Sequence, residues 1–452
     1  MLHELTHARQ FAEVGPILAR LEGQRGLPNP LSDDSLQETF EKDPAYLAAY
    51  ELEMKALFSA ALDPDPSLRE MPDDVVAVAY DVGAPIPAEH IDADALGHNL
   101  RAVQQHVGRR CRILAVVKAD GYGHGAIEAA RTFVDAGAWG LAVSLVEEGV
   151  ELRRVGIVAP VLVLGGVPPG SEDVIVHRSL TPVVWAREHL QLLAAAVQRS
   201  GAPPLPVHIK VDTGMSRLGV LPGDLPALVD WLAGEDGQHL HVEGLMTHFA
   251  CADEANDTTS PVQVEVFRAC VATLASRGLH PPLRHVCNSA GVVRMQHAHF
   301  DMVRPGIALY GAASGREVEL PGLRMAMSVH SRILGIRELP AGAKVSYGHC
   351  MTLTRDSRLG IVPVGYADGY ARRMSGQAQV LVRGHRCRVV GNITMDVSMI
   401  DVTDLPDARE GERVTLLGAQ GRDCIAVYEL AAWADVITYE ITCGISKRVP
   451  RR

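Results

Sequence analysis

The sequence predicts an α/β chain in which a (β/α)8 barrel of the TIM type precedes a mostly β C-terminal domain. Three observations predict this fold class. Eight apolar, strand-like runs recur between residues 113 and 304, and helical patterns separate most of them. Short β-rich runs replace the helical periodicity after about residue 320. The chain has 452 residues, of which 47% are hydrophobic, and this length suits two domains plus an additional segment.

The additional segment begins with an HExxH match formed by His3, Glu4 and His7. This spacing puts both imidazoles on one helix face for zinc and leaves the glutamate as a general base, as in zinc peptidases. A third ligand would come from Glu51 or Glu53. The strands that normally form the cleft of such a site would have to precede residue 3, so we expect a helical remnant without metal. A zinc peptidase in this segment remains the alternative from another functional class.

Proline-rich stretches at residues 63–66 and 71–74 predict a linker after this segment. We therefore expect an N-terminal extension and linker over residues 1–84, the barrel over residues 85–320 and the β domain over residues 321–452.

The barrel prediction depends on the number of strand-like runs. They lie at residues 113–118, 139–143, 161–164, 180–185, 207–212, 241–246, 284–287 and 302–304. The clearest helical patterns between them lie at residues 187–200 and 262–277. A doubly wound sheet would explain any five of these runs, but no GxGxxG motif follows an early strand.

The β domain is predicted from short runs that are separated by turns. They lie at residues 328–336, 358–364, 379–383, 386–390 and 413–417. One helical pattern follows them, at residues 427–434.

Charge and composition narrow the classes of partner. The chain has 54 acidic and 43 basic residues, and its net charge of -11 argues against nucleic acid and anionic membranes as general partners. No apolar run has transmembrane length, and no leader of the secretory type begins at Met1. We therefore expect a cytoplasmic protein without a membrane partner. The eight cysteines are widely spaced and form no CxxC pair, so we expect free thiols.

Lys118 lies where the first strand of the barrel ends and a glycine-rich turn begins. In α/β folds this edge of the sheet is where chemistry is usually placed. Apolar surroundings would lower the pKa of the lysine, and the neutral amine can attack a carbonyl carbon. The position therefore predicts Schiff-base chemistry, with an ordinary surface lysine as the alternative.

Polar residues also follow the last four strands of the predicted barrel. They are Lys210 and Arg217 after the fifth strand, His248 after the sixth, Asn288 and Ser289 after the seventh, and Arg304 to Ile307 after the eighth. A single arginine or histidine at such a position is more often structural. Four polar strand ends on one rim predict an active site.

The run VVKADGYGHG at residues 116–125 resembles the cofactor-lysine motif of alanine racemases, which use pyridoxal 5'-phosphate to interconvert L- and D-alanine. Matching motifs follow in order: VSYG at residues 345–348, GYADGY at 365–370, GNITMD at 391–396 and the segment 439–451. The resemblance covers about residues 88–452.

The resemblance implies a role for each catalytic position. Lys118 binds the cofactor and moves the α-proton on one face of the substrate, and Tyr347 is the base on the opposite face. His248 bonds the phenolate of Tyr347, while Arg217 holds this histidine and lies near the substrate carboxylate. Lys210 matches a lysine that is carbamylated in many relatives, with an ordinary ion-paired lysine as the alternative.

Arg304 matches the arginine that faces the pyridine nitrogen of the cofactor. A guanidinium stays charged and only donates hydrogen bonds, so this nitrogen is expected to stay unprotonated and the ring to be a weaker electron sink. The further cofactor-binding residues that the resemblance implies are Tyr122, Asn288, Ser289, Gly306, Ile307 and Tyr439. The implied substrate-binding residues are Arg217, Met395, Asp396 and Tyr366.

The resemblance also implies a partner and a role. In the family the tyrosine base comes from the β domain of the second subunit, so we expect an obligate homodimer with two shared active sites and a supply of D-alanine for peptidoglycan. A broad-specificity amino-acid racemase and a decarboxylase of similar design remain alternatives. The bulky side chains of Tyr366 and Met395 favour alanine over larger substrates, and the tyrosine base favours racemisation over decarboxylation.

Overall fold

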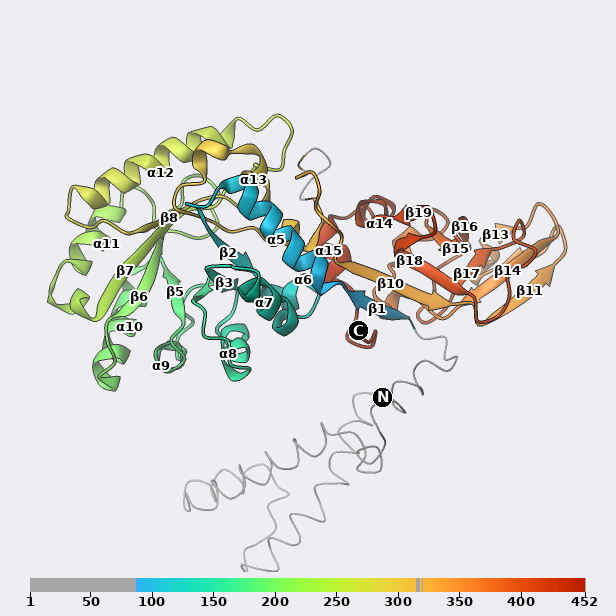
Figure 1. Cartoon of the computed structure of the whole chain (residues 1–452), viewed down its shortest axis with the longest axis horizontal. Coiled ribbons are helices and arrows are strands. Elements are labelled where there is room, and N and C mark those ends of the chain that lie inside the picture. The colour runs from blue at the N-terminus through green and yellow to red at the C-terminus, as the bar shows by residue number, and fades with distance from the viewer. Residues whose placement is uncertain (1–86, 314–317, 319, 452) are drawn as a thin grey trace, which may run out of the picture. The chain divides into compact units, whose positions relative to one another are not determined.

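The computed structural model describes residues 87–313, 318 and 320–451 (Figure 1). The predicted zinc-ligand residues His3, Glu4, His7, Glu51 and Glu53 lie outside this part of the chain. Within it, no group of three or more His, Cys, Asp or Glu side chains is arranged to hold a metal ion. None of its helices is long and apolar enough to cross a membrane.

Eight parallel strands form a barrel that is nearly closed, in the order β8-β7-β6-β5-β4-β3-β2-β9. Their bounds are β2 Arg112–Val116, β3 Gly140–Val143, β4 Val161–Val163, β5 Thr181–Val184, β6 Leu205–Lys210, β7 Leu240–Met246, β8 Leu283–His285 and β9 Met302–Val303. Backbone bonds join β8 to β9: Asp301 N donates to Arg284 O at 3.1 Å, and Arg304 N donates to Cys287 O at 2.9 Å. All eight predicted strands are confirmed, with their ends within two residues of the prediction.

Helices cover the outside of the barrel strands (Figure 1). Their bounds are α5 Ala93–Val107, α7 Ala126–Asp135, α8 Val146–Arg154, α9 Glu172–His177, α10 Arg187–Ser200, α11 Leu225–Leu232, α12 Thr259–Ala275 and α13 Ser289–Arg294. Helix α10 shows why they form, because Leu190, Leu193, Ala194 and Val197 recur at helical spacing and are all buried. Helix α10 matches its predicted range, and α12 begins three residues before the predicted helix.

The β domain is an antiparallel sheet with the strand order β1-β10-β18-β15-β16-β17-β14-β11, in which β19 also pairs with β18. The bounds are β1 Ala88–Ile91, β10 Met327–Arg332, β11 Gly335–Leu339, β14 Ser357–Val362, β15 Gln379–Val382, β16 His385–Val390, β17 Ser398–Asp401, β18 Arg413–Gln420 and β19 Asp423–Ile425. A separate hairpin joins β12 Lys344–Val345 to β13 Met351–Thr352. Helix α14 Val427–Ala434 matches its predicted range.

One predicted β run is divided in the structure. Residues 328–336 were expected as one run, but β10 ends at Arg332 and β11 begins at Gly335. The two strands have different partners, since β10 pairs with β1 and β18, whereas β11 pairs with β14 at the other edge. The chain therefore bends at Ile333, whose N–H bonds Glu412 O, and Leu334, whose N–H bonds Ile361 O.

Two segments connect the barrel to the β domain. Strand β1 precedes the barrel in sequence but pairs with β10, and Glu89 lies opposite Val329 in this ladder. Near the C-terminus, α15 Thr438–Cys443 packs beside α6 Lys118–Tyr122, which contains the predicted cofactor lysine. The sequence indicated neither connection. The expected domain boundaries stay a prediction.

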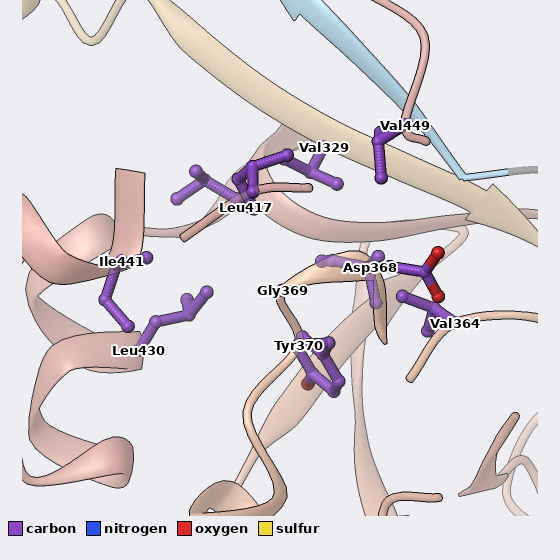
Figure 2. A pocket seen from close by; sticks show the side chains of 11 residues that line it. Val329, Val364, Asp368, Gly369, Tyr370, Leu417, Leu430, Ile441 and Val449 are labelled. Atoms are coloured by element: carbon purple, nitrogen blue, oxygen red, sulfur yellow. The ribbon is translucent and has the colours of Figure 1, made fainter. Parts of the chain in front are cut away.

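The interior of the β domain contains a cavity of about 20 Å³. Figure 2 shows that Val329 and Leu417 of the sheet, Leu430 and Ile441 of the helices, and Tyr370 line it. This volume holds about one water molecule. The cavity is therefore too small for an organic cofactor.

Candidate active site

Lys118 begins a turn of left-handed helix. Ala119, Asp120, Gly121, Tyr122 and Gly123 all have positive φ angles, from 52° to 88°. For residues with a side chain this conformation costs roughly 1–2 kcal/mol each, so the surrounding structure must hold the turn. Such strain is typical of functional sites.

Two side chains and one helix from distant parts of the chain hold this turn. The Oε1 atom of Glu148, on α8, accepts a hydrogen bond from Ala119 N at 2.6 Å. The Nε atom of Arg451, near the C-terminus, donates to Gly123 O at 2.9 Å. Helix α15 packs so closely that a Cβ atom on Gly123 would overlap with the carbonyl of Thr442. The position of Lys118 is thus fixed by segments that are distant in sequence.

The environment of Lys118 lowers its pKa. Partial burial is the largest cause, and the positive charge of Arg217 acts in the same direction. Glu148 and Cys443 oppose this shift. The direction agrees with the expectation from the apolar strand, and it raises the fraction of neutral, nucleophilic amine.

Positive charges gather at this end of the barrel. Lys210, which ends β6 and is 6% exposed, has a pKa lowered to about 8 by burial and then by Arg304 and Arg217. The pKa of His248 lies well below its usual value because of burial and of the charges of Arg304, Lys210, Arg217 and Lys118. A cluster of four cations around a neutral imidazole is suited to binding an anionic ligand.

Arg304 joins the ends of three strands. Its guanidinium, on a residue only 3% exposed, donates to Thr247 O at 2.8 Å, Val286 O at 3.0 Å, His285 Nδ1 at 3.0 Å and His248 Nδ1 at 3.1 Å. Arginine has no acceptor atom, so both imidazole Nδ1 atoms must accept. The neutral His248 therefore carries its hydrogen on Nε2.

The partner of His248 differs from the sequence prediction. Arg217 was expected to hold this histidine, but Arg304 makes the contact. Arg217 lies in the exposed loop after β6, and none of the described residues accepts a hydrogen bond from its side chain. Arg304 is favoured because it follows β9 inside the barrel, where its guanidinium reaches the ends of β7 and β8.

A chain of hydrogen bonds continues from Arg304 into the barrel core. His285 Nε2 bonds His208 Nδ1 at 2.8 Å, and His208 Nε2 bonds Glu243 Oε2 at 3.1 Å. Since His285 accepts at Nδ1, its Nε2–H donates, and His208 in turn donates to the carboxylate. These three residues were not predicted from the sequence. The sequence signal that could have identified them was His208, a polar residue two positions before Lys210 and therefore on the same face of the strand.

A second group of predicted residues lies together around Gly306. Ser289 Oγ accepts from Gly306 N at 2.9 Å and from Ala308 N at 3.3 Å. The hydroxyl of Tyr122 lies so close to Gly306 that a Cβ atom there would overlap with it. The ring of Tyr439 lies 5.8 Å from that of Tyr122. Hydroxyls and backbone N–H groups are the donors that bind phosphate.

Two further residues that were predicted to bind the cofactor make contacts within the barrel. Asn288 caps α13, where its side-chain oxygen accepts from Gly291 N at 2.9 Å. Ile307 begins the short helix η4 Ile307–Tyr310, and its side chain is fully buried. Ile307 can therefore contribute only backbone atoms to a ligand.

The predicted residues of the β domain form a separate group on its surface. Tyr347 is 71% exposed, Met395 is 52% exposed and Tyr366 is 41% exposed. Their segments are adjacent, since Asn392 Nδ2 donates to Tyr347 O at 3.1 Å and the N–H after Tyr366 donates to Met395 O at 3.0 Å. Asp396 pairs with Arg448 on the same surface, at 2.7 Å. Within the described chain, no hydrogen bond, ion pair or ring contact joins Tyr347 to the barrel.

Comparison with known proteins gives the family. A model of the alanine racemase N-terminal domain matches residues 91–314, and a model of the alanine racemase C-terminal domain matches residues 326–452. The chain belongs to the alanine racemase family. An alanine racemase of Symbiobacterium thermophilum is 45% identical over 362 residues, which are 80% of this chain and 95% of that protein.

Solved structures of alanine racemases share the fold. The alanine racemase of Streptomyces coelicolor A3(2) is 37% identical, with a TM-score of 0.78 over 82% of this chain and 98% of that one. The alanine racemase of Bartonella henselae, which has covalently bound pyridoxal phosphate, is 28% identical with a TM-score of 0.74. That match covers 82% of this chain and 99% of the other.

The residues at the barrel mouth fit pyridoxal 5'-phosphate. Lys118 supplies a partly buried amine with a lowered pKa. Ser289 and Tyr122 place two hydroxyl donors for a phosphate beside Gly306. Arg304 keeps an Nε–H that none of the described residues accepts, and this donor suits an unprotonated ring nitrogen.

Proposed function

We propose that this chain is an alanine racemase that binds pyridoxal 5'-phosphate through Lys118 and interconverts L- and D-alanine. The observation that carries the proposal is the left-handed turn, which places the amine of Lys118, with its lowered pKa, at the barrel mouth beside three other basic side chains. Membership of the family gives the reaction, and the site supplies the groups that the reaction needs.

Each group around the cofactor has a role. Tyr122, Ser289 and Tyr439 contribute hydroxyls to the phosphate, and backbone N–H groups near Gly306 and Ile307 approach it closely. Arg304 would hold the ring nitrogen by donating a hydrogen bond to it, and Asn288 shapes the same region through its cap on α13. When bound, the cofactor withdraws electrons from the α-carbon of the substrate, which makes the hydrogen on that carbon acidic.

Two bases on opposite faces of the substrate then move the proton. Tyr347, as a phenolate, would accept the α-proton of L-alanine, and the protonated amine of Lys118 would donate a proton to the other face. The roles reverse for D-alanine. A free phenol has a pKa near 10, so it needs a neighbour that favours its ionised form. The Nε2–H of His248 is the donor in place for this role, because Arg304 occupies Nδ1.

Tyr347 reaches the barrel of a second subunit in this proposal. Its exposure, together with that of Tyr366 and Met395, supports an obligate homodimer with two active sites, each shared between two chains. Met395 and Asp396 of one subunit, with Arg217 of the other, bind the substrate carboxylate. Exposed apolar groups on a surface of this kind are typical of an interface.

Lys210 is carbamylated in this proposal. Its pKa of about 8 leaves a neutral amine that can react with carbon dioxide, and the carbamate anion would offset the surrounding cations and position Arg217. Mass measurement of the intact protein distinguishes a carbamate from the alternative, an ordinary lysine. We also propose a cytoplasmic location and a role in supplying D-alanine for peptidoglycan.

The test of the function is a spectrum and an assay. Purified protein should absorb at about 420 nm, the region of a lysine-bound cofactor, and borohydride reduction followed by peptide mapping should place the label on Lys118. The same preparation should racemise both alanine enantiomers. A colourless protein that takes up no pyridoxal phosphate would overturn the proposal.

A further inference from the structure

Glu89 is a buried carboxylate that the proposed reaction does not use. It lies on β1, and its side chain is 0% exposed. Neither carboxylate oxygen has a hydrogen-bond partner among the described residues. The nearest cation is Arg451, whose Nε lies 3.6 Å from Glu89 Oε2. A buried carboxylate without hydrogen bonds is costly and calls for a reason.

Arg451 connects this carboxylate to the turn that presents Lys118. Its Nε atom donates to Gly123 O at 2.9 Å, and its Nη2 atom lies 3.6 Å from Asp120 Oδ2. Both contacts fall inside the left-handed turn. The guanidinium therefore lies between Glu89 on one side and the turn on the other.

Backbone hydrogen bonds fix the position of Glu89 beside Arg451. Glu89 N donates to Pro450 O at 3.0 Å, and Glu89 forms a parallel bridge with Arg451. Strand β1 is itself paired with β10 along its whole length. Glu89 is thus anchored to the β sheet, whereas Asp120 and Gly123 belong to the barrel.

The charge of Glu89 determines how its side chain interacts with Arg451. Burial raises its pKa to about 7, and the charge of Arg451 offsets part of this shift. A neutral side chain of the same size would avoid the cost of burying the charge. The carboxylate has one charged neighbour of opposite sign, so its effect is to fix Arg451.

We infer that Glu89 is a positioning residue that, through Arg451, holds the left-handed turn and so aligns Lys118 for the cofactor. The inference rests on the proposed role of Lys118. It adds a residue that acts two contacts away from the cofactor and has no contact with substrate.

The experiment measures the turn directly in cofactor-free protein. Hydrogen exchange followed by mass spectrometry reports the peptide that contains residues 118–126, at pH 8.5, where Glu89 is ionised. In Glu89→Gln, exchange of this peptide should become about tenfold faster and pyridoxal phosphate binding about tenfold weaker, the lower end of the effect of residues that support a ligand-binding group. In an Arg451→Gln background, Glu89→Gln should change neither quantity further.

Val329→Ala is the matched control. Val329 lies opposite Glu89 in the β1–β10 ladder and is buried, so its truncation weakens the same strand pair without touching the charge. This control should lower thermal stability while the exchange of residues 118–126 stays at the parent rate.

Two results would overturn the inference. One is an unchanged turn in Glu89→Gln, and the other is equal acceleration in Val329→Ala at equal loss of thermal stability. If the parent protein bound no pyridoxal phosphate, the proposed function would fail, while the exchange comparison would still decide the role of Glu89.

Discussion

The Nη2 group of Arg304 donates a hydrogen bond to Nδ1 of His248 over 3.1 Å. This contact fixes the imidazole as the tautomer with hydrogen on Nε2. It also connects His248 to His285, which accepts from the same guanidinium at 3.0 Å. One buried side chain therefore orients the donor proposed for the phenolate and the groups behind it.

Replacing Arg304 by lysine should reduce both turnover and stability. A lysine amine has three donors on a flexible chain and cannot reach the four acceptors that the guanidinium satisfies. We expect kcat to fall by about 100-fold, and the free energy of unfolding by about 3 kcal/mol, since buried polar partners lose their hydrogen bonds.

Arg284→Lys is the control for this substitution. Arg284 pairs with Asp301 at 2.6 Å, but its side chain is 41% exposed. Its replacement should cost less than about 1 kcal/mol and leave kcat unchanged. Steady-state kinetics and urea unfolding measure both variants. Equal effects of the two substitutions would contradict the role of Arg304.

Tyr347→Phe should separate cofactor binding from proton transfer. The substitution removes only the hydroxyl of an exposed side chain, so the fold and the absorbance at about 420 nm should persist. Racemisation should fall by about 10²–10⁴-fold, the usual contribution of one acid–base group. In Lys118→Ala both racemisation and this absorbance should be lost. Near-normal racemisation by Tyr347→Phe would refute the two-base scheme.

Gly123→Ala should disrupt the turn at Lys118. Gly123 has a φ of 88°, and a Cβ atom would overlap with Thr442 O, so both conformation and packing oppose a side chain. We expect a loss of about 3 kcal/mol or more in the free energy of unfolding. Gly201→Ala is the control, because Gly201 has a φ of 66° with nothing within 4 Å. It should cost only about 1 kcal/mol. Urea unfolding compares the two.

Acid should destabilise the protein below about pH 6.5. Burial lowers the pKa of seven described histidines, namely His124 to about 4, His330 to about 3, and His189, His208, His248, His285 and His299 below the usual value. The unfolded chain binds these protons near pH 6.5, so the stability from neutral histidines is complete above this pH and is lost as the pH falls toward 4. For His124 the loss amounts to about 3 kcal/mol.

Ionisation of Glu89 changes stability with pH in the opposite direction to the histidines. Its raised pKa of about 7 means that the folded state binds its proton more readily, so it adds stability as the pH falls from about 7 to 4.5. The seven histidines outnumber this one group, so the net trend is loss of stability. Urea midpoints at several pH values measure this loss of stability, and His124→Asn should reduce the slope of the midpoint against pH. A midpoint that rises steadily on acidification would contradict the assignment.

The fold could be predicted from the sequence wherever a periodic pattern decides the structure. Short apolar runs such as Ile113 to Val116 favour buried strands, and the alternation with helices leaves few topologies. The pairing of β1 with β10 could not be predicted, because four residues carry no information about a partner more than 200 positions away. The division of residues 328–336 into two strands also depends on tertiary partners.

Only part of the site was predicted from the sequence. Lys118, Ser289 and Arg304 stand at strand ends, where position alone indicates chemistry. Glu89 and Glu243 lie within strands and look like ordinary surface or core residues, since only the folded structure brings them to their partners.

Mixing two inactive variants tests whether each active site is shared between two subunits. Lys118→Ala and Tyr347→Phe should each be inactive as homodimers. When equal amounts are unfolded and refolded together, half of the dimers are mixed, and one of the two sites in each then combines an intact Lys118 with an intact Tyr347 from the partner. Shared active sites should give recovery of about a quarter of the parent racemase activity. No recovery, with mixed dimers demonstrated by mass spectrometry, would contradict an active site shared between subunits.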